Sequence, residues 1–166
     1  KKILAICLVL MLCVPVFASA EGVVKIGVFQ PVTGENGGGG FQEVLGIRYA
    51  NELTPTVEVG GETYKIELVE VDNKSDKTEA VTAAQSLMAS GVAAVLGSYG
   101  SGVSIAAGEI FADAGVPAIG CSCTNPQVTL GNDFYFRVCF LDPVQGTVME
   151  NYSFQDGSKT AVVTTQ

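Results

Sequence analysis

The stretch from Val92 to Asn125 most constrains the fold, because two short apolar runs within it each end abruptly in small polar residues. The runs are Ala93–Leu96 and Val116–Ile119, and the segment 103–114 between them has helical character and stops at Gly115. This order predicts strand, polar turn, helix, strand and polar turn. A right-handed crossover of this kind makes the two strands parallel in one sheet. Both polar turns are therefore expected at the carboxyl edge of that sheet.

Open α/β sheets bind small ligands outside the carboxyl ends of their strands. We therefore expect the turns 98–101 and 121–124 to face one another across one crevice. Free amides at the start of the intervening helix, and the positive end of its dipole, favour a carboxylate there. Ser98 and Ser101 add hydroxyl groups at that end, although capping of the helix would explain them equally well. Tyr99 either lies beside the ligand or only covers the helix end.

The N-terminus has the three-part pattern of a secretory signal peptide. Two lysines are followed by the apolar run Ile3–Phe17 and then by Ala18-Ser19-Ala20. This pattern predicts that residues 1–20 are a signal peptide cleaved after Ala20, and that the mature protein is periplasmic or otherwise extracytoplasmic. A transmembrane helix is disfavoured because the run is short for a span of about 20 residues and contains Pro15.

Composition excludes several classes of function. The chain of 166 residues carries a formal net charge of −8 and has no histidine. The negative charge disfavours nucleic acid, whose phosphates require lysine and arginine. The absence of histidine removes the commonest general base and a common zinc ligand. No cofactor and no metal site are indicated.

Three cysteines, Cys121, Cys123 and Cys139, lie beyond the expected signal peptide. The first two are too close for an unstrained bridge within one extended turn. Cys139 could pair with either only if the fold brings it near. The simplest interpretation is three small thiols that are buried or half-buried.

The remaining pattern alternates strands and helices, as expected of an α/β fold. A small hairpin is expected around Gly60-Gly61. Ser75 and Asp142 are expected to cap the helices that follow them. The glycine-rich loop 31–40 lacks the spacing of a phosphate-binding loop. The expected strands are 23–30, 64–71, 93–96, 116–119, 134–138 and 160–164, and the expected helices are 41–53, 78–90, 103–114 and 143–154.

The sequence stops directly after the last expected strand. A buried parallel strand with no helix behind it is an unusual place for a domain to finish. We therefore expect a truncated sequence.

Five segments together resemble one protein family. They read VKIGVFQPVTG, YKIELVEVDNKSD, VAAVLGSYGSGVS, IFADAGVPAIGCSCTNPQVT and YFRVCFLDPVQG. They are similar to the extracytoplasmic solute-binding proteins of branched-chain amino acid ABC transporters, the type I periplasmic binding proteins. The resemblance implies two α/β lobes, each a mostly parallel Rossmann-like sheet with helices on both faces, joined by hinge strands and closing on a ligand. It assigns 21–140 to the N-terminal ligand-binding lobe and 141–166 to the start of an incomplete second lobe.

The resemblance also implies a set of ligand contacts. Ser101 matches the serine that binds the carboxylate of an amino acid through its hydroxyl and amide. Ser122 would supply a backbone carbonyl, and Thr124 its hydroxyl, for the carboxylate and ammonium groups. Tyr99, Ser98 and Cys123 complete the predicted ligand-binding set. Amino acid binders of this family often present an aromatic side chain to the ligand from the loop before the first helix. In this sequence that position is near Gly39, which has no side chain.

The functional prediction is a monomeric, non-enzymatic component that binds an amino acid and delivers it to a membrane permease. The resemblance implies an amino acid of the branched-chain class. The alternative is a sensory or regulatory module of the same fold that binds an amino acid or amide. An enzyme of flavodoxin-like or Rossmann class is disfavoured. Neither turn carries paired carboxylates, and the phosphate motif is absent.

Overall fold

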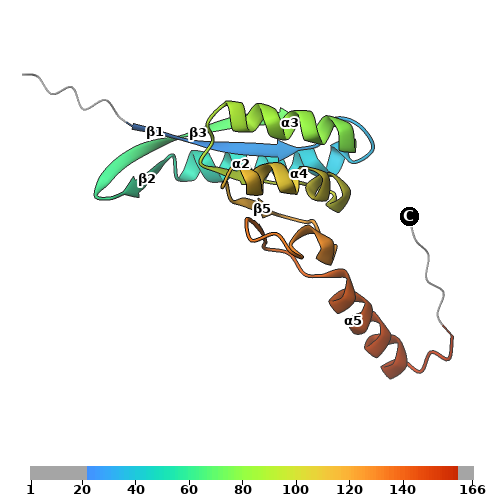
Figure 1. The fold of residues 1–166 in the computed structure, drawn as a ribbon. Coiled ribbons are helices and arrows are strands. Elements are labelled where there is room, and N and C mark those ends of the chain that lie inside the picture. The colour runs from blue at the N-terminus through green and yellow to red at the C-terminus, as the bar shows by residue number, and fades with distance from the viewer. Residues whose placement is uncertain (1–21, 161–166) are drawn as a thin grey trace, which may run out of the picture.

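The computed structural model describes residues 22–160, which form a six-stranded sheet with helices on both faces (Figure 1). The expected signal peptide and all but the first residue of the expected strand 160–164 lie outside the described residues. Within 22–160, no helix has the length and apolar character needed to cross a membrane.

The sheet has the strand order β2-β3-β1-β4-β5-β6, with every neighbouring pair parallel except β2 and β3. The mostly parallel sheet predicted from the sequence is therefore confirmed. Each strand was expected within a few residues of its observed bounds. These are β1 Gly22–Gln30, β2 Thr56–Val59, β3 Glu62–Asp72, β4 Ala94–Leu96, β5 Ala118–Gly120 and β6 Tyr135–Arg137.

The long pair β1 and β3 forms the backbone of the sheet, in a register that runs from Gly22 opposite Tyr64 to Gln30 opposite Asp72. The predicted hairpin is also confirmed, because β2 pairs with β3 in antiparallel fashion around Gly60 and Gly61, both at positive φ. Glycine adopts this backbone conformation without the steric cost that other residues incur. The hairpin extends beyond the helices at one end of the sheet (Figure 1).

Helices cover both faces because the crossover from β1 to β3, through α2 (Gly37–Leu53), runs to one side of β1, whereas the crossover from β3 to β4, through α3 (Lys77–Ala89), runs back past β1 to the other side. Successive side chains of a strand point to opposite faces, and Phe29 joins the main core whereas Val28 does not. The main core contains side chains of α3 and α4, including Leu87 and Phe111. Val44 of α2 is buried outside this cluster. The helices are α2 Gly37–Leu53, α3 Lys77–Ala89, α4 Ser101–Asp113, the 3-10 turn η1 Pro126–Val128 and α5 Asp142–Gln155.

Three local predictions require correction. Helix α2 begins at Gly37 rather than Phe41, so part of the glycine-rich loop is helical. The N-cap of α3 is Asp76 rather than Ser75, because the Asp76 carboxylate accepts hydrogen bonds from the amides of the second and third helical residues. Ser75 has φ 58° and is held in the preceding turn. The N-cap of α5 is Leu141, and Asp142 is the first helical residue.

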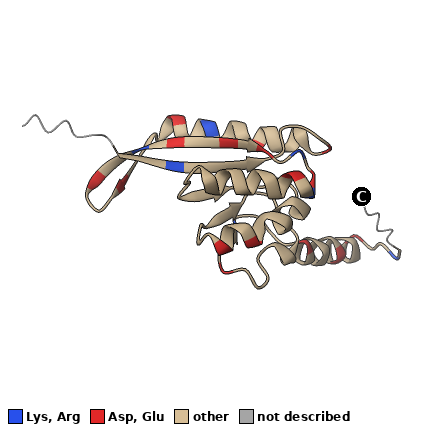
Figure 2. Ribbon diagram, turned by 45° about the horizontal axis from the view of Figure 1, so that its top comes forward, with Lys and Arg blue, Asp and Glu red and all other residues tan. Residues whose placement is uncertain are grey.

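Helix α5 projects away from the sheet (Figure 1), and none of its residues is buried. Asp and Glu outnumber Lys and Arg, with 17 against 9 in the whole sequence, and acidic positions are spread over several elements (Figure 2). The surface therefore carries the negative charge inferred from composition.

Candidate functional site

The predicted turns follow β4 and β5, which are adjacent and parallel. Both turns therefore lie at the carboxyl edge of the sheet, as the sequence predicted. The connection from β1 leads to β3 on one side, whereas β4 pairs with β1 on the other. This reversal is a topological switch point, where open α/β sheets bind their ligands. We refer to residues 98–101 and 121–125, with Glu43, as the carboxyl-edge site.

Ser101 joins the two turns directly. It is the first residue of α4, and its Oγ accepts a hydrogen bond of 3.2 Å from the amide of Asn125. The preceding Gly100 has φ 101°, a conformation that glycine allows and that brings the chain into the helix. The first amides of α4 have no acceptor within the helix. A half-buried hydroxyl and the positive end of a helix dipole thus lie together.

Ser122 connects the second turn to α2. Its hydroxyl donates to Oε1 of Glu43, whose Oε2 accepts a hydrogen bond of 2.6 Å from Nε2 of Gln30. The Oε1 of Gln30 in turn accepts a hydrogen bond of 2.7 Å from the amide of Tyr99. One continuous chain of hydrogen bonds therefore links both turns through a carboxylate. Charge-assisted bonds of this type are about twice as strong as neutral ones.

Two members of the predicted set, Ser98 and Cys123, lie inside the protein and have no exposed surface. The Ser98 hydroxyl accepts from Nδ2 of Asn73 at 2.8 Å and donates to the carbonyl of Tyr99 at 3.1 Å. Cys123 belongs to the main core. In this conformation their side chains support the turns from within, whereas Tyr99, Ser101, Ser122 and Thr124 are half-buried.

Arg137 of β6 holds the second turn from behind. Its Nη1 donates to the carbonyls of Cys123 and Asn125 at 2.8 and 2.9 Å, and its Nη2 donates to the carbonyl of Pro126 and the hydroxyl of Thr129. A guanidinium has five rigidly arranged donors and is well suited to such a task. The Thr124 carbonyl also accepts from the amide of Asp142, which attaches the start of α5 to this turn.

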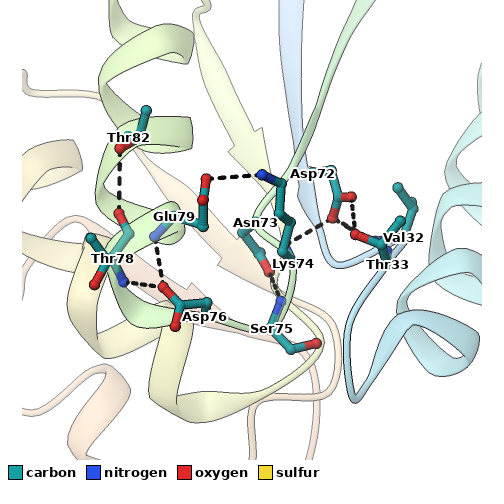
Figure 3. A network of polar contacts seen from close by, with 10 residues as sticks. All are labelled: Val32, Thr33, Asp72, Asn73, Lys74, Ser75, Asp76, Thr78, Glu79 and Thr82. Atoms are coloured by element: carbon teal, nitrogen blue, oxygen red, sulfur yellow. Dashed lines mark hydrogen bonds and ion pairs between the residues drawn. The ribbon is translucent and has the colours of Figure 1, made fainter.

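A second polar network fixes the loop after β1 against the loop after β3 (Figure 3). The carboxylate of Asp72 accepts hydrogen bonds from the Thr33 hydroxyl at 2.5 Å and from the amides of Val32 and Lys74 at 2.9 and 2.8 Å. The Asn73 side chain accepts from the amide of Ser75 and reaches Ser98 on its other side. Hydrogen bonds between the loops that follow β1, β3 and β4 therefore hold the base of the carboxyl-edge site.

The thiols of the second turn are poor nucleophiles. Burial, followed by the charge of Glu43, raises the pKa of Cys121 to about 11. Burial also raises the pKa of Cys123 to about 11. Both are therefore neutral thiols at physiological pH, and the thiolate is the reactive form. Cys121, Cys123 and Cys139 are free, as expected from the sequence.

Sequence reasoning missed Gln30, Glu43, Asn73 and Arg137. Arg137 could have been identified from the sequence, because it is the one charged residue in the apolar segment 134–138. The sequence indicates Gln30 and Asn73 more weakly, as polar residues at or just after the ends of strands β1 and β3. No sequence pattern indicates Glu43, because a glutamate on a helix is usually exposed to solvent.

The fold is that of one α/β lobe with two polar turns together at the carboxyl edge of its sheet. A sequence profile of the periplasmic binding protein family matches residues 23–166. The Leu/Ile/Val-binding protein homolog 1 of Brucella melitensis is 37% identical over 151 residues, which cover 87% of this chain and 40% of that protein. The chain belongs to the periplasmic binding protein family.

Solved structures agree with this assignment. A leucine binding protein LivK from Thermotoga maritima is 39% identical with a TM-score of 0.74, covering 80% of this chain and 37% of that one. LivJ from Streptococcus pneumoniae, a branched-chain amino acid transporter substrate binding protein in complex with isoleucine, is 32% identical with a TM-score of 0.71, covering 79% and 38%.

More distant structures share only the fold. A solute binding protein of an ABC transporter from Rhodopseudomonas palustris, in complex with 3,4-dihydroxybenzoic acid, is 22% identical with a TM-score of 0.73, covering 81% of this chain and 37% of that one. This chain therefore spans about two fifths of the length of the relatives and structures that it matches.

Proposed function

We propose that this chain forms the first lobe of an extracytoplasmic solute-binding protein that binds an amino acid, of the branched-chain class, and delivers it to an ABC transporter permease. The observation that carries the proposal is the carboxyl-edge site, where Ser101 at the start of α4 is hydrogen-bonded to Asn125 of the second turn. The proposal includes no chemical conversion of the ligand. Residues from 141 onward begin the second lobe, and the ligand lies between the two lobes.

The site suits both charged ends of an amino acid. The hydroxyl of Ser101 and the first amides of α4 are donors for a carboxylate. The carbonyl of Ser122 and the hydroxyl of Thr124 offer acceptors for an ammonium group, and the nearby carboxylate of Glu43 adds negative charge. Charged hydrogen bonds contribute roughly 1.5–3 kcal/mol each. Two or three of them, with burial of an apolar side chain, would account for micromolar binding at about −8 kcal/mol.

A simple carboxylic acid is the competing class of ligand, because a protein of the same fold holds 3,4-dihydroxybenzoic acid. That likeness is at 22% identity and concerns the fold alone. The charge of Glu43 favours a ligand with an ammonium group, which the aromatic acid lacks. A sensory protein of the same fold would bind the same ligand, and copurification with a permease would separate transport from sensing.

The test is calorimetry of the full-length protein that contains this chain, with the twenty amino acids and a set of aromatic and aliphatic acids. We expect binding of branched-chain amino acids and no binding of the corresponding acids that lack the amino group. Binding of the aromatic acids alone, or of a sugar or nucleoside, would overturn the assignment.

Ser101→Ala tests the site itself. Loss of one charged hydrogen bond to the ligand carboxylate is expected to weaken binding by about tenfold or more. Thr82→Ala is the control, since Thr82 is exposed on α3 and its hydroxyl bonds only the carbonyl of Thr78. Unchanged affinity in Ser101→Ala would remove Ser101 from the ligand contacts.

A further inference from the structure

Gly39 lies in the first turn of α2, against the ring of Tyr99. A Cβ placed on Gly39 would lie 2.5 Å from Cζ of Tyr99 and 2.7 and 2.8 Å from its two Cε atoms. Non-bonded carbon atoms settle at about 3.5–4.0 Å. The Tyr99 ring therefore occupies the space that any side chain at position 39 would need.

The backbone of Tyr99 is fixed on both sides. Its amide donates to Oε1 of Gln30 at 2.7 Å, and its carbonyl accepts from the Ser98 hydroxyl at 3.1 Å. Both partners are fully buried. A ring displaced from Gly39 must therefore rotate about its own side-chain bonds, because the backbone cannot easily move.

The Tyr99 ring is half-buried and belongs to the same turn as Ser101. Its hydroxyl donates no hydrogen bond to any residue between 22 and 160. A rigid aromatic surface beside a few polar groups is the usual composition of a small-molecule site. The ring is thus placed to meet whatever extends from a carboxylate bound at Ser101.

We propose that Tyr99, packed on Gly39, is the wall that receives the side chain of the ligand, and that the absent side chain at position 39 sets how large a ligand is admitted. This inference rests on the proposed function. A larger residue at position 39 pushes the ring off α2 and into the space beside Ser101. The size limit is therefore set by a residue that need not touch the ligand.

The chain contains a matched pair of variants for the test. A Cβ on Gly39 meets the Tyr99 ring, whereas a Cβ on the adjacent Gly38 meets nothing within 4 Å. Both glycines lie in the first turn of α2, so Gly39→Ala and Gly38→Ala change the same helix in the same way. Affinities for alanine, valine, leucine and phenylalanine are measured by calorimetry on the full-length protein.

We expect Gly39→Ala to lose at least about tenfold in affinity for leucine and phenylalanine, a magnitude typical of a changed apolar pocket. Affinity for alanine should stay within about twofold, as for a surface change. Gly38→Ala should retain the ligand preference of the wild type. Equal losses for all four ligands in Gly39→Ala, or an unchanged preference, would overturn the inference.

Tyr99→Ala provides a second route if Gly39→Ala does not fold. It should weaken the discrimination between large and small side chains, and the double variant Gly39→Ala/Tyr99→Ala should behave as Tyr99→Ala alone. Additive effects would show that the two residues do not act through their contact. A wild type that binds none of the amino acids would instead overturn the proposed function and the size rule with it, which is a distinguishable result.

Discussion

At the scale of single residues, Asn73 makes more of the hydrogen bonds that support the site than its position in a turn suggests. Its side chain is fully buried, donates to Ser98 at 2.8 Å and accepts from the amide of Ser75 at 3.2 Å. Its backbone amide donates to the carbonyl of Gln30. One residue therefore joins the ends of β1 and β3 to the turn after β4.

Asn73→Ala removes both side-chain hydrogen bonds and leaves buried groups unpaired. Each such group costs about 1–3 kcal/mol, so the free energy of unfolding should fall by about 2–4 kcal/mol. Urea unfolding of the full-length protein measures this loss. Gln85→Ala, which removes an exposed amide on α3, is the control and should stay within about 0.5 kcal/mol. Equal stabilities of the two variants would show that the Asn73 bonds contribute nothing.

At the scale of elements, the carboxylate of Asp72 connects the loop after β1 to the loop after β3 (Figure 3). Partial burial raises the pKa of Asp72, but hydrogen bonds from the Thr33 hydroxyl and from the amides of Val32, Lys74 and Thr33 outweigh burial and lower it below its usual value. A lowered pKa in the folded state means that the ionised form stabilises the fold. This contribution is present above the unfolded pKa of about 3.9 and disappears as the pH falls through the lower folded pKa.

Asp72→Asn should therefore lower the urea midpoint at pH 7, and the difference from the wild type should shrink as the pH falls below about 4. The amide has one acceptor oxygen instead of two and cannot accept from all four donors. Asp113→Asn, at the exposed end of α4, removes the same charge without this network and serves as the control. A difference between Asp72→Asn and wild type that is independent of pH would contradict the assignment of the effect to ionisation.

The elements themselves were largely predictable, because burial imposes a clear pattern on them. The buried strand β1 and the paired turns after β4 and β5 follow from apolar runs that end in small polar residues. Local rules failed where a tertiary contact decided the outcome. Ser75 is a good capping residue, yet its hydroxyl accepts from the amide of Asn36 in another loop, so Asp76 caps α3 instead.

The site was predictable as a location and only partly as a set of contacts. The topology rule places both turns at one edge, but it does not say which hydroxyls face inward. Ser98 and Ser101 are equivalent in the sequence pattern, whereas the structure buries Ser98 against Asn73. The hydrogen bonds from Ser122 through Glu43 and Gln30 to Tyr99 join four separate segments: the turn after β5, helix α2, strand β1 and the turn after β4. No local sequence pattern contains them.

At the scale of the whole molecule, the described part of the chain leaves one side of the sheet unfinished. Strand β6 pairs with β5 and has no second neighbour within 22–160. Large apolar side chains on and after it are exposed: Phe136 by 53%, Val138 by 76% and Phe140 by 56%. The chain spans about two fifths of the length of its relatives. We infer that further chain covers this edge in the full-length protein.

The same reasoning predicts how the isolated lobe behaves. Residues 22–140 alone should bind leucine at least about 100-fold more weakly than the full-length protein, because the ligand contacts of the proposed second lobe are missing. Loss of two charged hydrogen bonds from that lobe corresponds to about 3 kcal/mol or more. The uncovered β6 edge should also cause self-association. Sedimentation and calorimetry of the isolated lobe measure both effects.

Val138→Lys in the isolated lobe should reduce self-association without altering the ligand contacts. The Val138 side chain is exposed, and only its amide bonds the carbonyl of Gly120. If this soluble variant bound leucine as tightly as the full-length protein, binding between two lobes would be ruled out, and the carboxyl-edge site would have to hold the whole ligand by itself.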